Sequence, residues 1–170
     1  RWMTSGGLGT MGYGLPAAVG VQIAHPDKLV IDIAGEASVL MTMQEMSTAV
    51  QYKLPIKIFI LNNQYMGMVR QWQELLHEKN YSESYTAALP DFVKLAEAYG
   101  CVGIQATKPD ELDEKINEMI NTKEPVIFDC RVDPAENCFP MIPSGKPHNQ
   151  MLLGPEDEKE EVSDEGKTLV

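Results

Sequence analysis

The chain has 170 residues, 44% of them hydrophobic and 23% charged, which is typical of one globular domain with or without a tail. The formal net charge is −11, from 14 Lys+Arg and 25 Asp+Glu, with no basic patch in the sequence, so nucleic-acid binding is not expected. Cys101, Cys130 and Cys138 form no CxxC or Cys/His spacing and no apolar run is long enough for a membrane span, which argues against a disulfide scaffold, a zinc site and a membrane protein and favours a reducing, cytoplasmic compartment.

Apolar periodicity and turn residues predict helices that alternate with strands. In chain order we expect a loop with five glycines over 5–14, a helix over 17–25, a strand over 28–34, an exit turn over 35–38, a helix over 41–52, a strand over 56–61, a short helix within 64–79, a helix after the cap Asp91 to Tyr99, a strand over 101–105, a helix over 110–122 and a strand over 125–132. This alternation predicts an α/β fold with a doubly wound, mainly parallel sheet and helices on both faces.

The pattern changes after the last predicted strand. We expect an α/β domain over 1–132, a Pro/Gly-rich extension that covers it over 133–154, and an acidic tail over 155–170. Residues 156–170 hold seven acids and two lysines, and such a charge run predicts a solvated, disordered tail.

Two features of the sequence favour different binding sites, namely a glycine-rich motif near the N-terminus and two polar clusters that follow predicted strands. Gly7 to Gly12 matches GxGxxG, but no strand precedes it as a dinucleotide fingerprint requires. Glu36 and Asn62-Asn63 follow neighbouring predicted strands, whose carboxyl ends share one edge of a parallel sheet. Their oxygens suit Mg²⁺ shared with a diphosphate, and the helix beginning near Ser38 offers N–H groups to it. The alternative is that Glu36 complements a helix dipole and the asparagines form a turn.

The segment GEA, followed by NN after a helix and a strand, resembles the GDG…NN signature of thiamine-diphosphate enzymes. The segments GGLGTMGYGLPAA, QEMSTAVQY, LNNQYMGMVRQWQ, DFVKLAEAYG and FPMIPSG are similar to the catalytic subunit of acetohydroxyacid synthase (acetolactate synthase). The likeness extends to about Gly154 and corresponds to that enzyme's C-terminal, cofactor-binding domain. Two preceding domains of the family are absent from this sequence.

The resemblance implies an enzyme that decarboxylates pyruvate and joins the two-carbon unit to pyruvate or 2-ketobutyrate, in valine and isoleucine biosynthesis. It implies Mg²⁺ ligands at Glu36, Asn63 and the Tyr65 carbonyl, and a substrate pocket at Met68 and Trp72. The cofactor-binding residues that it implies are Gly9, Met11, Gly35, Ala37, Ser38, Asn63, Met66 and Gly67.

Two departures from the family limit these expectations. The usual metal ligand is aspartate, whereas this chain has Glu36, whose longer side chain changes the geometry that Mg²⁺ requires. The family's catalytic glutamate lies in an N-terminal domain of the partner subunit, so no catalytic residue is expected here and the fragment should be inert alone. FAD, bound mainly by the middle domain, should not bind tightly.

The resemblance also implies a homodimer and a regulatory small subunit for the whole enzyme. Three alternatives remain open. The parent could be another thiamine-diphosphate decarboxylase or oxidase for 2-ketoacids, and the chain could be a non-catalytic nucleotide-binding module. It could also be an interaction domain in which Glu36 has abolished metal binding.

Overall fold

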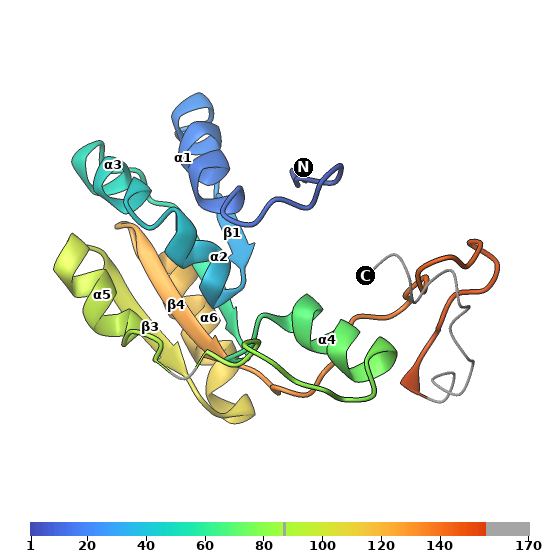
Figure 1. The fold of residues 1–170 in the computed structure, drawn as a ribbon. Helices are drawn as coiled ribbons and strands as arrows, with labels where there is room; N and C mark the ends of the chain where they lie inside the picture. Colours follow the sequence, from blue (N-terminus) through green and yellow to red (C-terminus); the bar gives the residue numbers. More distant parts are fainter. Residues whose placement is uncertain (87, 156–170) are drawn as a thin grey trace. The chain divides into compact units, whose positions relative to one another are not determined.

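The computed structural model describes residues 1–86 and 88–155, and Figure 1 labels its helices and strands. Its elements are α1 (Gly14–Ala24), β1 (Ile31–Ala34), α2 (Glu36–Met41), α3 (Glu45–Gln51), β2 (Lys57–Asn62), α4 (Gly67–Leu76), α5 (Phe92–Tyr99), β3 (Val102–Ala106), the short 3₁₀ helix η1 (Pro109–Glu111), α6 (Leu112–Asn121) and β4 (Val126–Arg131). The predicted acidic tail beyond Pro155 lies outside the described residues. None of the described helices has the length and apolarity to cross a membrane.

The four strands form one parallel sheet in the order β1-β2-β4-β3. This confirms the predicted α/β fold, since parallel neighbours are joined through helices. Side chains alternate between the two faces, and Ile127 and Phe128 on β4 belong to different hydrophobic clusters. The cluster with Ile127 is covered by α1, α3 and α5, whereas the cluster with Phe128 is covered by α6 (Figure 1).

The chain between β1 and β2 differs from the prediction. The expected exit turn at 35–38 is largely the start of α2, and the expected helix over 41–52 is divided into α2 and α3. The division occurs at Thr42, whose backbone φ of −134° is not helical and whose hydroxyl donates to the Gly12 carbonyl at 3.0 Å. A contact distant in sequence therefore interrupts a helix that apolar spacing alone would continue.

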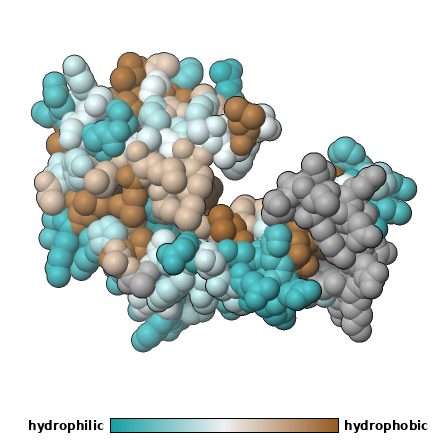
Figure 2. Space-filling model, in the orientation of Figure 1, coloured by the Kyte–Doolittle hydropathy of each residue, from teal (hydrophilic) through white to brown (hydrophobic). Residues whose placement is uncertain are grey.

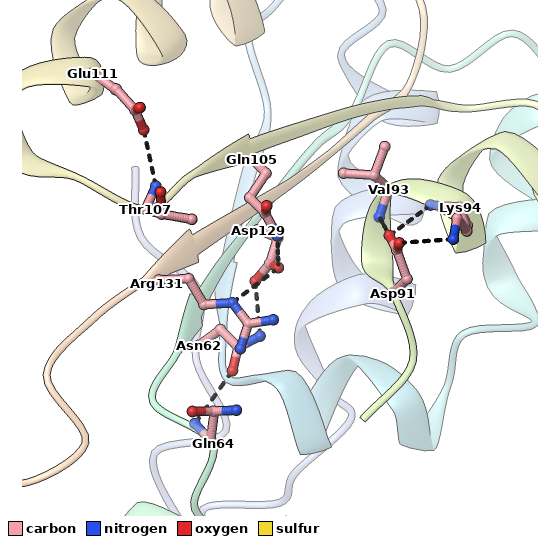
Figure 3. Close-up of polar contacts among 10 residues, drawn as sticks. All are labelled: Asn62, Gln64, Asp91, Val93, Lys94, Gln105, Thr107, Glu111, Asp129 and Arg131. Atoms are coloured by element: carbon pink, nitrogen blue, oxygen red, sulfur yellow. Dashed lines mark hydrogen bonds and ion pairs between the residues drawn. The ribbon is translucent and has the colours of Figure 1, made fainter. Parts of the chain in front are cut away.

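The ends of α5 agree with the prediction. The Asp91 side chain accepts hydrogen bonds from the Val93 and Lys94 N–H groups, both at 3.1 Å (Figure 3), as an N-cap should. Gly100 closes the helix with a φ of +85°, a conformation that glycine adopts without strain. The next strand then passes close to this helix, because a Cβ on Gly103 would lie 2.8 Å from the Val93 Cα.

The chain divides into two compact units. The first holds residues 1–64 and 88–133, with the whole sheet, and the second holds 65–86 and 134–155 among the described residues, with α4. The sequence prediction placed a boundary near 133, but nothing in the sequence indicated that 65–86 groups with the C-terminal segment. In the second unit, Tyr65 bridges to Tyr85 and Met141 bridges to Leu152.

One part of the sheet is uncovered within the first unit. β1 pairs with β2 and has no second strand partner among the described residues. Ile31 and Ile33 share the face of Phe59 and Phe128 by register, yet they are 40% and 57% exposed. Apolar surface is also interspersed with polar surface on the face seen in Figure 2. β1 is therefore an apolar edge strand, a feature that soluble proteins usually protect.

Candidate cofactor-binding site

Glu36 is the first residue of α2 and follows directly after β1 and Gly35, at the carboxyl edge of the sheet. Only 1% of it is exposed, and its Oε1 atom is buried without a hydrogen-bond partner. Buried carboxylate oxygens are normally paired with a donor or a cation. The Oε1 atom is therefore available to a bound cation.

The Glu36 carboxylate also meets the end of β2, as the sequence predicted. Burial raises the pKa of the Glu36 carboxyl above its ordinary value, and the charge of Asp129 raises it further. Backbone N–H groups of Glu36, Asn63 and Gln64 act in the opposite direction by hydrogen bonding to the charged form. Glu36 and Asn63, which follow different strands, thus lie together at one sheet edge.

Asn62, the neighbour of Asn63, has a different role. It is 1% exposed, and its Nδ2 donates to Asp129 Oδ1 at 2.8 Å while its Oδ1 accepts the Gln64 N–H at 3.2 Å. Asp129 Oδ2 accepts from Gln105 at 2.9 Å and lies 3.3 Å from the Arg131 Nε (Figure 3). This network ties β2, β4 and β3 together behind the turn that bears Asn63.

This network was not predicted from the sequence, although acidic residues inside predicted buried strands indicated it. Asp129 lies inside the apolar run PVIFDCRV, and Asp32 lies inside LVIDIA. An acid in a buried strand needs a partner, so each could have been marked as a polar centre. Among the described residues, no group of three or more His, Cys, Asp or Glu side chains is arranged to hold a metal. The implied set has a single carboxylate together with amide and carbonyl oxygens.

The glycine loop is bonded to α2 through Gly12. The Gly12 N–H donates to the Ser38 Oγ at 2.8 Å, and its carbonyl accepts from the Thr42 hydroxyl at 3.0 Å. Gly12 has a φ of +84°, and a Cβ there would lie 3.2 Å from the Met41 Cβ. This position therefore requires glycine, and Ser38 serves as an acceptor for the loop while its own proton remains available to another group.

A cleft of about 990 Å³ lies beside the glycine loop in the first unit. Four of the predicted cofactor-binding residues line it, namely Gly9, Met11, Gly35 and Ser38, whereas Ala37 and Asn63 do not. Asp32 also lines this cleft, and it is 6% exposed with an Oδ2 that has no hydrogen-bond partner. The structure thus brings two separate glycine-containing segments of the sequence to one cleft.

The other predicted residues belong to the second unit. Tyr65 and Met66 precede α4 and Gly67 is its first residue. Met68 and Trp72 lie one turn apart on this helix. Met68 is 51% exposed and Trp72 is half-buried. The spacing places both side chains on the same side of the helix.

The family description "Thiamine pyrophosphate enzyme, C-terminal TPP binding domain" matches residues 1–130. The chain belongs to this family. The match includes the glycine loop, Glu36, Asn63 and α4, so these residues all lie within the part that defines a thiamine-pyrophosphate-binding domain. It confirms the family and the fold class that the sequence motifs indicated.

Acetolactate synthase subunits are among the similar proteins. The chain is 52% identical over 153 residues to the acetolactate synthase large subunit of Cyanidium caldarium, covering 89% of this chain and 26% of that protein. It is 49% identical over 162 residues to the mitochondrial acetolactate synthase catalytic subunit of Saccharomyces cerevisiae, covering 95% of this chain and 23% of that protein. The chain therefore spans about a quarter of the length of these relatives.

A solved structure with the same fold is the thiamine diphosphate-dependent 4-hydroxybenzoylformate decarboxylase of Rhodococcus jostii RHA1. The TM-score is 0.67 with 32% sequence identity, over 72% of this chain and 23% of that one. The thiamine-diphosphate-binding fold is thus shared by a relative named for decarboxylation and relatives named for acetolactate synthesis.

Proposed function

We propose that the chain is the cofactor-binding part of a carboligase that decarboxylates pyruvate and joins the two-carbon unit to pyruvate or 2-ketobutyrate, the entry to valine and isoleucine biosynthesis. The main support is that the chain is 46–52% identical in sequence to acetolactate synthase large subunits over 89–94% of its length. Because the chain spans about a quarter of those proteins, this activity is assigned to the parent enzyme.

In this proposal Glu36 and Asn63 are ligands of Mg²⁺, and the buried Oε1 of Glu36 is the atom that fits a cation. A buried carboxylate with one unpartnered oxygen and an amide oxygen are hard ligands of the kind that Mg²⁺ prefers. Tyr65, whose carbonyl is the third implied ligand, begins the second unit. The Gly35 and Ala37 backbone and the Ser38 hydroxyl would bind the diphosphate oxygens.

The glycine loop would hold the pyrimidine end of the cofactor, with Gly9 and Met11 on the cleft wall and Met66 and Gly67 as further contacts. The two bonds from α2 to Gly12 would fix this loop relative to Ser38. Thiamine diphosphate, when bound, supplies the electron sink for decarboxylation of a 2-ketoacid. The chain's own residues contribute binding and orientation, and Met68 and Trp72 would contact the second ketoacid.

The remaining parts belong to the same proposal for the whole enzyme. A glutamate from an N-terminal domain of a partner subunit, a middle domain that binds FAD, a homodimer, a regulatory small subunit and a cytoplasmic location are inferred from the resemblance. Because the glutamate lies outside these residues, the chain alone should show no turnover. Turnover by the isolated chain would contradict this assignment of catalytic residues.

Calorimetric titration of thiamine diphosphate into the chain, with and without Mg²⁺, tests the site. We expect Mg²⁺-dependent binding that Glu36→Gln weakens by about tenfold, or about 1.4 kcal/mol, because the amide removes the charge that meets the cation. Glu36→Asp should tighten binding, since its shorter side chain restores the ligand usual in the family. Glu97→Gln is the matched control, because Glu97 is exposed on α5.

Three results of this titration would count against the proposal. Equal binding by Glu36→Gln and the unchanged chain would remove Glu36 from the metal site. Binding of NADH without binding of thiamine diphosphate would favour the nucleotide-binding alternative. Binding by Glu36→Asp alone would mean that this chain's own site is impaired and would favour an interaction domain.

A decarboxylase is the second candidate, favoured by the name and fold of the Rhodococcus relative. The two reactions differ in product, since a decarboxylase releases an aldehyde from pyruvate and a carboligase forms acetolactate. Product analysis of the full-length parent enzyme with pyruvate therefore separates them. Acetaldehyde without acetolactate would refute the carboligase proposal.

A further inference from the structure

Arg70 is a cation buried inside the second unit. It lies on α4 with 4% of its surface exposed, above the Tyr65 ring at 5.9 Å from the centroid. One terminal nitrogen, Nη2, donates to the carbonyls of Ala135 at 2.9 Å and Glu136 at 3.0 Å and to Asn137 Oδ1 at 2.6 Å. The other, Nη1, is paired with Glu74 one turn along the helix.

Gln71 makes a second set of contacts with the same stretch of chain. It is 1% exposed, its Oε1 accepts the Cys138 N–H at 2.7 Å, and its Nε2 donates to the Cys138 carbonyl at 3.0 Å. The Nε2 also lies 3.0 Å from the Met141 sulfur. The side-chain amide thus pairs with both backbone groups of Cys138, as a neighbouring strand would.

Together these contacts fix α4 against residues 135–141, termed here the 135–141 segment. A guanidinium has donors in a rigid plane and an amide has a defined donor and acceptor, so both contacts specify direction as well as distance. The segment has no helix or strand of its own among the described residues. The backbone of Met141 pairs with Leu152, whereas the carbonyls of Ala135, Glu136 and Cys138 are bonded by these two side chains.

The fixed side of α4 is not the side of Met68 and Trp72. With about 100° of rotation per residue, Arg70 projects roughly opposite to the Met68–Trp72 side, and Gln71 lies between the two. The exposed fraction agrees, since Met68 is 51% exposed and Arg70 is 4% exposed. Holding Arg70 and Gln71 therefore sets the rotation of α4 and, with it, the direction of Met68 and Trp72.

We propose that Arg70 and Gln71 are positioning residues that orient Met68 and Trp72 toward the second ketoacid by fixing α4 on the 135–141 segment. This inference rests on the proposed function. The two residues touch neither substrate nor cofactor in this proposal and act through the rotation of the helix. Changing them should alter the choice of second substrate more than the binding of thiamine diphosphate.

The first experiment offers pyruvate and 2-ketobutyrate together to the full-length parent enzyme and measures the ratio of the two products. We expect Arg70→Met and Gln71→Leu to change this ratio by about threefold or more, while the Kd for thiamine diphosphate stays within about twofold. Asn137→Ala, which removes one acceptor of Arg70 from the other side, is a milder variant expected to change the ratio in the same direction. Val69→Ala, at an exposed position of α4, is the control and should leave the ratio unchanged.

The second experiment needs no catalysis and uses the present chain. The sequence has two tryptophans, Trp2 and Trp72, so Trp2→Phe leaves Trp72 as the only indole. In that background, Arg70→Met and Asn137→Ala should each change the acrylamide quenching of Trp72 fluorescence, and Val69→Ala should not. This measurement reports the rotation of α4 even where a variant of the parent enzyme fails to fold.

The outcomes separate this inference from the proposed function. A parent enzyme that makes no acetolactate would overturn the proposed function and the ketoacid part of this inference, and Trp72 quenching would then decide whether the contacts orient α4. If the parent makes acetolactate but all three variants keep the product ratio, the positioning role is wrong. Loss of thermal stability with an unchanged ratio would identify the contacts as structural only.

Discussion

Because the carboxyl group of Asp32 on β1 is buried, the free energy of unfolding should depend on pH. Asp32 is 6% exposed, its Oδ2 has no hydrogen-bond partner, and its Oδ1 lies against Gly14 so closely that a Cβ on that glycine would be 2.1 Å away. Burial raises the pKa of Asp32 from 3.8 to about 6. At about 1.4 kcal/mol for each tenfold change in the equilibrium, ionisation at neutral pH costs the folded state up to about 3 kcal/mol.

The direction of this pH dependence follows from the linkage between proton binding and folding. Because the folded state holds the proton more tightly than the unfolded state, the stability that protonated Asp32 contributes is fully present below pH 4 and is lost as the pH rises through about 6. Asp32→Asn is neutral at every pH and of nearly the same shape. Relative to the unchanged chain, this variant should gain stability between pH 4 and pH 7.

Urea unfolding of both chains at intervals from pH 4 to pH 8 measures this difference directly. The difference in the free energy of unfolding should grow with pH by up to about 3 kcal/mol and level off above pH 7. Asp27→Asn, at an exposed position, is the control and should show no such change. A difference for Asp32→Asn that stays constant across this range would refute the reasoning.

Two further predictions concern packing and thiol chemistry. Gly103→Ala should lower the free energy of unfolding by about 2 kcal/mol, because the new Cβ meets the Val93 Cα at 2.8 Å. Gly20→Ala, in open space on α1, should raise the free energy of unfolding by about 0.5 kcal/mol. A urea-unfolding midpoint unchanged by Gly103→Ala would contradict the first expectation. At pH 8 one thiol should react quickly with a disulfide reagent and Cys138→Ser should abolish that phase, since Cys138 is exposed while burial raises the pKa of Cys101 to about 11 and also raises that of Cys130. A fast phase that survives Cys138→Ser would show that a buried thiol is accessible.

The strands were the most predictable part of the fold. Short apolar runs such as IKIFIL and PVIFDCRV led to β2 and β4 within about a residue at each end, because buried parallel strands need little else than apolar side chains. The cap at Asp91 and the end at Gly100 were equally local signals. Each of these features depends on residues within a few positions of one another.

The errors came from contacts between distant parts of the chain. Thr42 ends a helix because its hydroxyl bonds to Gly12, thirty residues earlier, and no periodicity within 41–52 contains that information. The grouping of 65–86 with the C-terminal segment depends on contacts such as those of Arg70 with Ala135 and Glu136. Such contacts form only once the chain has folded.

The candidate site was predictable in part. Two strand ends that meet at one sheet edge follow from parallel topology, and Glu36 and Asn63 do meet there. The different roles of Asn62 and Asn63 could not be predicted, because only the structure shows that Asn62 is bonded to Asp129. The roles of Gly9, Met11, Met68 and Trp72 rest on the resemblance and remain predictions.

The open edge of β1 affects how this chain behaves at high concentration. Ile31 and Ile33 lie on β1, whose outer edge pairs with no strand in the part of the chain that the structure describes, and such an edge can pair with the same edge of another copy. The net charge of −11 opposes that encounter, since like-charged molecules repel each other. Salt shortens the range of this repulsion to about 10 Å at 0.1 M, so low ionic strength favours the dispersed chain during purification and storage.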